Sequence, residues 1–73
     1  MNISNETLDS LFEYHAPTDD QIADMKILRT DAKILARTIN KVVPESADKS
    51  AAIRLLRQCV QISNAGIVLN GVV

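Results

Sequence analysis

The feature that most constrains the fold is the stretch from Pro17 to Val43, which contains no glycine and no further proline. Thr18 followed by Gln21 has the spacing of a capping box, and two acidic residues come directly after Thr18, where the helix dipole favours negative charge. The pattern predicts a helix of roughly 25 residues, about 38 Å long at 1.5 Å per residue. Apolar residues recur along it at steps of three and four, the period of one helical face, namely Ile22, Met25, Leu28, Ala32, Leu35, Ile39 and Val42.

Two further helices flank this stretch. Ser4 can cap a short one over residues 4–12, and Ser46 can cap a long one over residues 46–70 that ends before Gly71. Only a short link around Pro44 separates the two long helices, and such links join antiparallel neighbours. We therefore predict an all-α fold in one domain, residues 1–73, with a short N-terminal helix (4–12) and a helical hairpin (18–43 and 46–70).

Association between chains is expected from length and composition. A single core in a chain of 73 residues supplies only about 3–5 kcal/mol, so proteins of this size usually add disulfides, a metal or a partner chain. Cys59 is the single cysteine, which excludes an intrachain disulfide, and one histidine is too few for a structural zinc cluster. Apolar residues make up 47% of the chain and cover more than one face of the last helix, so we predict a homo-oligomer.

Charge and hydropathy argue against several functions. The net charge of −1 and the pI of about 5.6 disfavour binding to DNA or RNA polymers, whose partners are usually basic. No apolar run reaches the roughly 18 residues of a membrane helix, and the N-terminus lacks the pattern of a secretory signal. We expect a cytoplasmic protein without membrane contact.

A row of cations runs along the long helix at steps of three and four, formed by Lys26, Arg29, Lys33, Arg37 and Lys41. One interpretation is a solvated face with nearby carboxylates as partners. The other is a site for a small anionic ligand, which requires Tyr14 and an arginine to come together. In that case the aromatic ring stacks on a base and the guanidinium pairs with a phosphate.

Catalysis receives little support from the sequence. Cys59 lies within an apolar stripe and is best interpreted as a core thiol, since a reactive cysteine needs an exposed electropositive setting. His15 has no serine, cysteine or acid beside it that would make it a general base, and no glycine-rich phosphate loop is present. We expect no enzymatic activity, no cofactor and no metal site.

Residues 12–71 resemble a family of small phage proteins, the anti-CBASS sponges, which block cyclic-oligonucleotide-based antiphage signalling. The resemblance does not depend on a single motif but on many residues that recur at the same spacing as in the family. The matching residues are Phe12, Tyr14, His15, Pro17, Ile27, Leu28, Arg29, Ala32, Lys33, Val43, Pro44, Ser46, Asp48, Lys49, Ser50, Asn64, Ala65, Ile67 and Asn70.

The resemblance implies a helical homo-hexamer in the cytoplasm of the infected bacterial host. It implies pockets, shared by two subunits, that bind cyclic dinucleotides such as cyclic GMP-AMP without cleaving them. At matching positions Tyr14 would stack on a base and Arg29 would meet a phosphate, while His15 and Lys26 are candidates by proximity. Some members hold a second, cyclic trinucleotide site with an arginine where this chain has Leu69. The missing guanidinium argues against trinucleotide binding here, and Asn64 and Asn70 are candidates that could replace it only in part.

An alternative function belongs to another class. A non-enzymatic helical oligomer could bind a partner protein through its surface, with the cationic row solvated or facing an acidic helix. Dependence of ligand binding on Tyr14 and Arg29 alone favours the pocket, whereas equal contributions along the row favour the protein partner.

Overall fold

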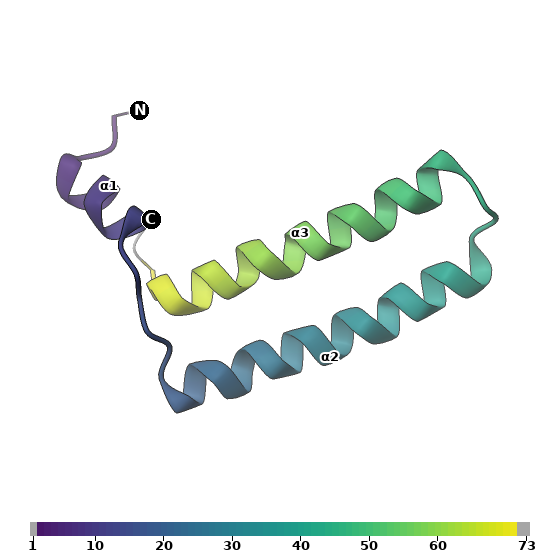
Figure 1. Ribbon diagram of the computed structural model, residues 1–73, viewed down its shortest axis with the longest axis horizontal. Helices are drawn as coiled ribbons and strands as arrows, with labels where there is room; N and C mark the ends of the chain where they lie inside the picture. The colour runs from purple at the N-terminus through teal and green to yellow at the C-terminus, as the bar shows by residue number, and fades with distance from the viewer. Residues whose placement is uncertain (1, 72–73) are drawn as a thin grey trace.

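The computed structural model describes residues 2–71, and all regular structure in that range is helical. Its elements are α1 (Asn5–Phe12), α2 (Asp19–Val42) and α3 (Ala47–Leu69). Helices α2 and α3 pack against each other as an antiparallel hairpin, and α1 lies beyond the open end of that hairpin (Figure 1). The predicted all-α fold, a short helix followed by an antiparallel hairpin, is confirmed.

The capping residues at the helix ends account for the small differences between the observed and the expected bounds. Each helix begins one residue later than expected, because Ser4, Thr18 and Ser46 have extended backbone and act as N-caps. Their hydroxyl oxygens accept hydrogen bonds from backbone N–H groups three residues on, at 3.1, 3.2 and 3.1 Å. The long helices also end one residue earlier, at Val42 and Leu69, because Val43 is extended and Asn70 is left-handed with φ 48°.

Polar side chains fasten the hairpin at both ends. At the open end, the Gln21 amide Nε2 donates to the Ile67 carbonyl at 3.0 Å, while Gln21 Oε1 accepts from the Thr18 N–H in the capping box. At the closed end, the Lys49 ammonium donates to the Asn40 carbonyl at 2.9 Å and to Glu45 Oε1 at 2.8 Å. Lys49 is only 8% exposed, and through its hydrogen bond and its charge it lowers the pKa of the Glu45 carboxyl.

Replacing Lys49 with methionine is expected to destabilise the protein. The substitution keeps the apolar stem but removes a charged donor from the Asn40 carbonyl, one of the last in α2 and without a helical partner. Hydrogen bonds from charged donors contribute about 1.5–3 kcal/mol, so the free energy of unfolding should fall by about 1.5 kcal/mol or more in urea titrations at one protein concentration. Lys41→Met, at an exposed position on α2, is the control and should cost about 0.5 kcal/mol; an equal loss in both variants would contradict this role for Lys49.

The facing sides of the hairpin are apolar but only partly covered. Half-buried residues recur at helical spacing on α2 (Met25, Leu28, Ala32, Ala36, Ile39) and on α3 (Ile53, Leu56, Val60, Ile67). No apolar side chain within residues 2–71 is fully buried. Outside this contact, apolar residues such as Ile27, Ile34, Leu55 and Ile62 are 57–72% exposed.

The overall shape explains this exposure. The chain measures 46 × 32 × 16 Å with a radius of gyration of 15.6 Å, against about 11 Å for a compact domain of this length. Its accessible surface is 5999 Å², whereas a folded monomer of 8.0 kDa usually exposes about 4,500 Å². Two helices and one short appendage give a single layer, which cannot enclose a core.

Candidate ligand-binding site

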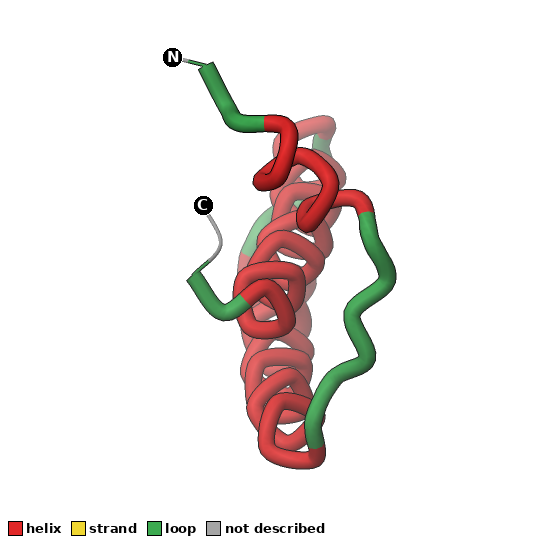
Figure 2. The backbone as a smooth tube through the Cα atoms, turned by 90° about the vertical axis from the view of Figure 1, so that its left-hand side faces the viewer, coloured by secondary structure: helices red, strands yellow, loops and turns green. Residues whose placement is uncertain are grey.

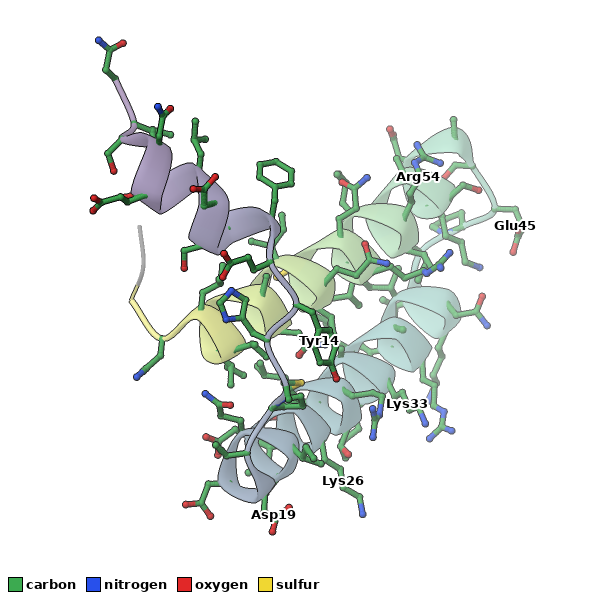
Figure 3. All side chains as sticks on the ribbon, turned by 60° about the vertical axis from the view of Figure 1, so that its left-hand side comes forward. Tyr14, Asp19, Lys26, Lys33, Glu45 and Arg54 are labelled. Carbon is green, nitrogen blue, oxygen red and sulfur yellow. The ribbon has the colours of Figure 1, made fainter. Side chains whose placement is uncertain are left out.

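The connector between α1 and α2 carries the first candidate residues. It passes across the open end of the hairpin, from α1 beside the end of α3 to the start of α2 (Figure 2). Glu13 is extended, with φ −85° and ψ 155°, and ends α1. Tyr14 follows it and is 88% exposed, so its ring is free to stack on a planar group (Figure 3).

His15 is tied into the fold. Its Nε2 donates a hydrogen bond to the Ser10 carbonyl in α1, and the side chain is half-buried. This bond holds the connector against α1 and fixes where Tyr14 leaves the backbone. One ring nitrogen of His15 is thereby used, and Nδ1 is left for any ligand.

Tyr14 and His15 line a shallow hollow of about 330 Å³ between the connector and the end of α3, here called the aromatic hollow. Half-buried apolar side chains from all three helices form its wall. Its other lining residues are Leu11, Glu13, Met25, Asn64, Ala65, Val68 and Leu69.

Arg29 lies in a different place. It lines a hollow of about 340 Å³ along one flank of the hairpin, here called the cationic hollow. Half-buried apolar residues make its floor, namely Ala32, Ala36, Ile53, Leu56 and Val60. Exposed polar residues make its rim, with Arg29 and Lys33 from α2 and Arg57 and Gln61 from α3.

Lys26 does not share the cationic hollow with Arg29. It lines a third, open hollow on α2 together with Ala23, Ile27, Thr30 and Asp31 (Figure 3 labels Lys26). A step of three residues turns a helix about 60° short of a full circle, which is enough to direct the two side chains to different flanks. Proximity in sequence therefore does not bring Lys26 into the surroundings of Arg29 within one chain.

The two asparagines near the end of α3 have distinct environments. The Oδ1 atom of Asn64 is buried and has no hydrogen-bond partner among the described residues. Asn70 is the C-cap of α3 in the left-handed conformation, and its N–H donates to the Gly66 carbonyl at 3.0 Å. The conformation of Asn70 therefore has a local reason, because asparagine tolerates positive φ better than most residues.

Arg57 and Gln61 were not among the residues singled out from the sequence. They are four residues apart on α3 and become neighbours of Arg29 only when the hairpin forms. The sequence shows them as two polar residues at helical spacing beside an apolar stripe. Whether such a pair faces Arg29 depends on how α3 is rotated against α2, which the spacing does not reveal.

Within one chain, Tyr14 and Arg29 line separate hollows. A ligand that contacts both must bridge the two hollows or take one residue from each of two chains. The residues described here contain no group of three or more histidine, cysteine or acidic side chains placed to hold a metal ion. None of the three helices is long and apolar enough to cross a lipid bilayer.

Comparison with known proteins identifies a family that this chain matches. The family model described as Acb2/Tad1, hairpin domain, matches residues 4–68 and so includes residues 4–11, which the resemblance over residues 12–71 left out. No curated protein and no solved structure matches the chain significantly. The match spans most of the chain and contains Tyr14, Arg29, the whole cationic hollow and the lining of the aromatic hollow apart from Leu69. The chain therefore belongs to the Acb2/Tad1 family of anti-CBASS sponges, a family of cyclic-nucleotide-binding proteins rather than enzymes.

Proposed function

We propose that this protein evades bacterial immunity for a phage by sequestering cyclic dinucleotide messengers in the cytoplasm of the infected host. It holds a messenger such as cyclic GMP-AMP without cleaving it and thereby keeps the CBASS effector inactive. The observation that carries this proposal is the family match over residues 4–68. The exposed Tyr14 ring and the cationic hollow at Arg29 support it, because a cyclic dinucleotide offers flat bases and two phosphodiesters.

The protein acts as a homo-oligomer, and we propose a hexamer as in the family. A subunit with no fully buried apolar side chain in its described part lacks the core that keeps a monomer folded. Its surface exceeds that of a usual monomer by about 1,500 Å², and a stable interface buries about 800 Å² per partner. The excess is thus close to the area that two such interfaces would bury on one subunit.

The ligand site lies between subunits in this proposal. Tyr14 and Arg29 line separate hollows of one chain, so a pocket shared by two chains can combine the Tyr14 ring of one with the Arg29 guanidinium of the other. Tyr14 stacks on a base, and Arg29 donates paired N–H groups to a phosphate. His15 and Lys26 contribute at the edges of this site, and Asn64 and Asn70 are assigned to a second site near the end of α3.

Sequestration requires affinity and abundance rather than turnover. The free messenger must fall below the concentration at which the effector responds, so the dissociation constant of the site must lie below that of the effector. When binding sites are in excess over the messenger, nearly all of the messenger is bound, and the effector stays inactive. An exposed ring and an exposed guanidinium are suited to this task, because stacking on a base and pairing with a phosphate need no prior chemical step.

The proposal is tested by calorimetry followed by recovery of the ligand. Cyclic GMP-AMP is titrated into the purified protein, the complex is heat-denatured, and the released nucleotide is analysed by chromatography. We expect saturable binding with fewer ligands than chains and recovery of intact cyclic GMP-AMP. Linear or mononucleotide products would show hydrolysis, and the absence of heat with cyclic GMP-AMP and other cyclic dinucleotides would remove the proposed ligand class.

A further inference from the structure

The cationic hollow draws its charges from both arms of the hairpin. We infer that Arg57 on α3 is a second phosphate-binding residue of the ligand site, so that the two phosphates of a cyclic dinucleotide contact Arg29 and Arg57, with Lys33 between them adding charge. This inference rests on the proposed function and deepens it by naming a residue on α3.

The first support is the concentration of charge. Three exposed cations, Arg29, Lys33 and Arg57, share one rim, and no acidic side chain of residues 2–71 lines the hollow. The ion pair within residues 2–71 joins Lys49 to Glu45, at the far end of the hairpin, and leaves these three cations without a carboxylate. Since the chain as a whole carries a net charge of −1, this cluster is not a consequence of a basic composition. Cations that share a rim repel one another, and an anion between them removes that repulsion.

The second support is the chemistry of the rim and the floor. An arginine presents a planar fork that pairs with two phosphate oxygens, and the hollow has one such fork on each wall. The half-buried floor of alanine, isoleucine, leucine and valine suits the apolar face of a ribose or base. Gln61 adds an amide that can donate to and accept from a base edge. These features fit a ligand with two separated phosphodiesters and flat apolar faces.

The rest of α3 offers a matched control. Arg54 lies three residues before Arg57, is exposed, does not line the hollow, and projects from α3 on the side away from α2 (Figure 3). Removing either arginine deletes the same charge from the same helix. Only Arg57 is placed to contact a ligand held by Arg29, so general electrostatic attraction and direct contact can be separated.

The test measures cyclic GMP-AMP affinity by calorimetry for the full-length wild-type protein and for Arg57→Ala, Arg57→Lys, Lys33→Ala and Arg54→Ala. We expect Arg57→Ala to weaken binding by about 10- to 100-fold, the range for a lost charge-assisted hydrogen bond, and Arg54→Ala to stay within about twofold. Arg57→Lys keeps the charge but loses the fork, so its affinity should lie between those of the wild type and Arg57→Ala. Lys33→Ala should weaken binding less than Arg57→Ala.

The outcomes separate this inference from the proposed function. If the wild type binds cyclic GMP-AMP but Arg57→Ala and Arg57→Lys both bind as tightly as Arg54→Ala, the role of Arg57 is wrong and the function stands. If the wild type binds no cyclic dinucleotide, the proposed function itself fails. Native mass measurements on each variant are the control: where the oligomer is unchanged, a loss of affinity reports on contact with the ligand.

Discussion

Arg29→Ala is expected to abolish measurable binding of cyclic GMP-AMP while leaving the oligomer intact. Arg29 is exposed at the rim of the cationic hollow, with no carboxylate partner within residues 2–71, so its removal should not disturb packing. It supplies paired hydrogen bonds to a phosphate, and their loss should cost about 100-fold or more in affinity. Every subunit of a homo-oligomer carries the substitution, so a pocket shared by two subunits loses all of its Arg29 contacts with the ligand.

Calorimetry with cyclic GMP-AMP measures this effect, and Arg37→Ala is the matched control. Arg37 is an exposed arginine on the same helix that does not line the cationic hollow. It should retain affinity within about twofold, apart from screened long-range attraction. Equal losses in Arg29→Ala and Arg37→Ala would favour an extended cationic surface for a partner protein over a pocket.

Tyr14→Ala provides the second half of this test. Stacking of a base on an aromatic side chain contributes about 1–3 kcal/mol, which corresponds to roughly 5- to 150-fold in affinity. Tyr14→Phe keeps the ring and should bind nearly as the wild type does. Tight binding retained by both Tyr14→Ala and Arg29→Ala would show that the site assignment is wrong.

Ile62→Asp is expected to break the oligomer. Ile62 is 72% exposed in the single chain, and helical spacing places it on one face of α3 with Leu55, Cys59 and Gly66. If this face is covered by another subunit, a carboxylate there lies in an apolar contact without a partner, which costs several kcal/mol per subunit. Sedimentation should show smaller species at concentrations where the wild type is fully assembled.

Ser50→Asp is the control for the added charge, since it introduces the same group at an exposed polar position of α3 and should leave the assembly unchanged.

Gly66→Ala tests whether another subunit lies close to the same face of α3. A Cβ at Gly66 meets nothing within 4 Å in the single chain, and alanine gains about 1 kcal/mol of helix propensity over glycine. If no neighbouring subunit lies against Gly66, the stabler helix should leave the oligomer as strong as before or stronger. If a helix of another subunit crosses closely at Gly66, the added methyl group should clash with it and weaken the oligomer.

Local spacing was enough to predict the three helices and their N-caps. The capping box of Thr18 and Gln21 and the caps at Ser4 and Ser46 depend on residues within one turn, so sequence distance and spatial distance agree. The expected bounds differed only because capping residues were counted as helical. The apolar period identified only part of the packing face of α2, since Met25, Leu28, Ala32 and Ile39 are half-buried but Ile22, Leu35 and Val42 are exposed. On α3, the prediction of a core thiol is wrong for the single chain, because Cys59 is exposed.

The side-chain contacts between α2 and α3 could not be predicted from the sequence. The burial of Lys49 and the meeting of Arg57 with Arg29 depend on the rotation of α3 about its own axis, which packing sets and spacing does not reveal. Lys26 lines another hollow of the single chain than Arg29 does, and its part in the ligand site stays a prediction. The pairing of Tyr14 with Arg29 stays a prediction, because it involves surfaces of more than one chain.

Native mass spectrometry of the purified protein with and without cyclic GMP-AMP tests the sponge function and its shared pockets together. We expect a discrete oligomer with an even number of chains, a hexamer, which gains whole cyclic GMP-AMP molecules at one per pair of chains. A monomer, or an oligomer whose mass does not change with any cyclic dinucleotide, would contradict this expectation.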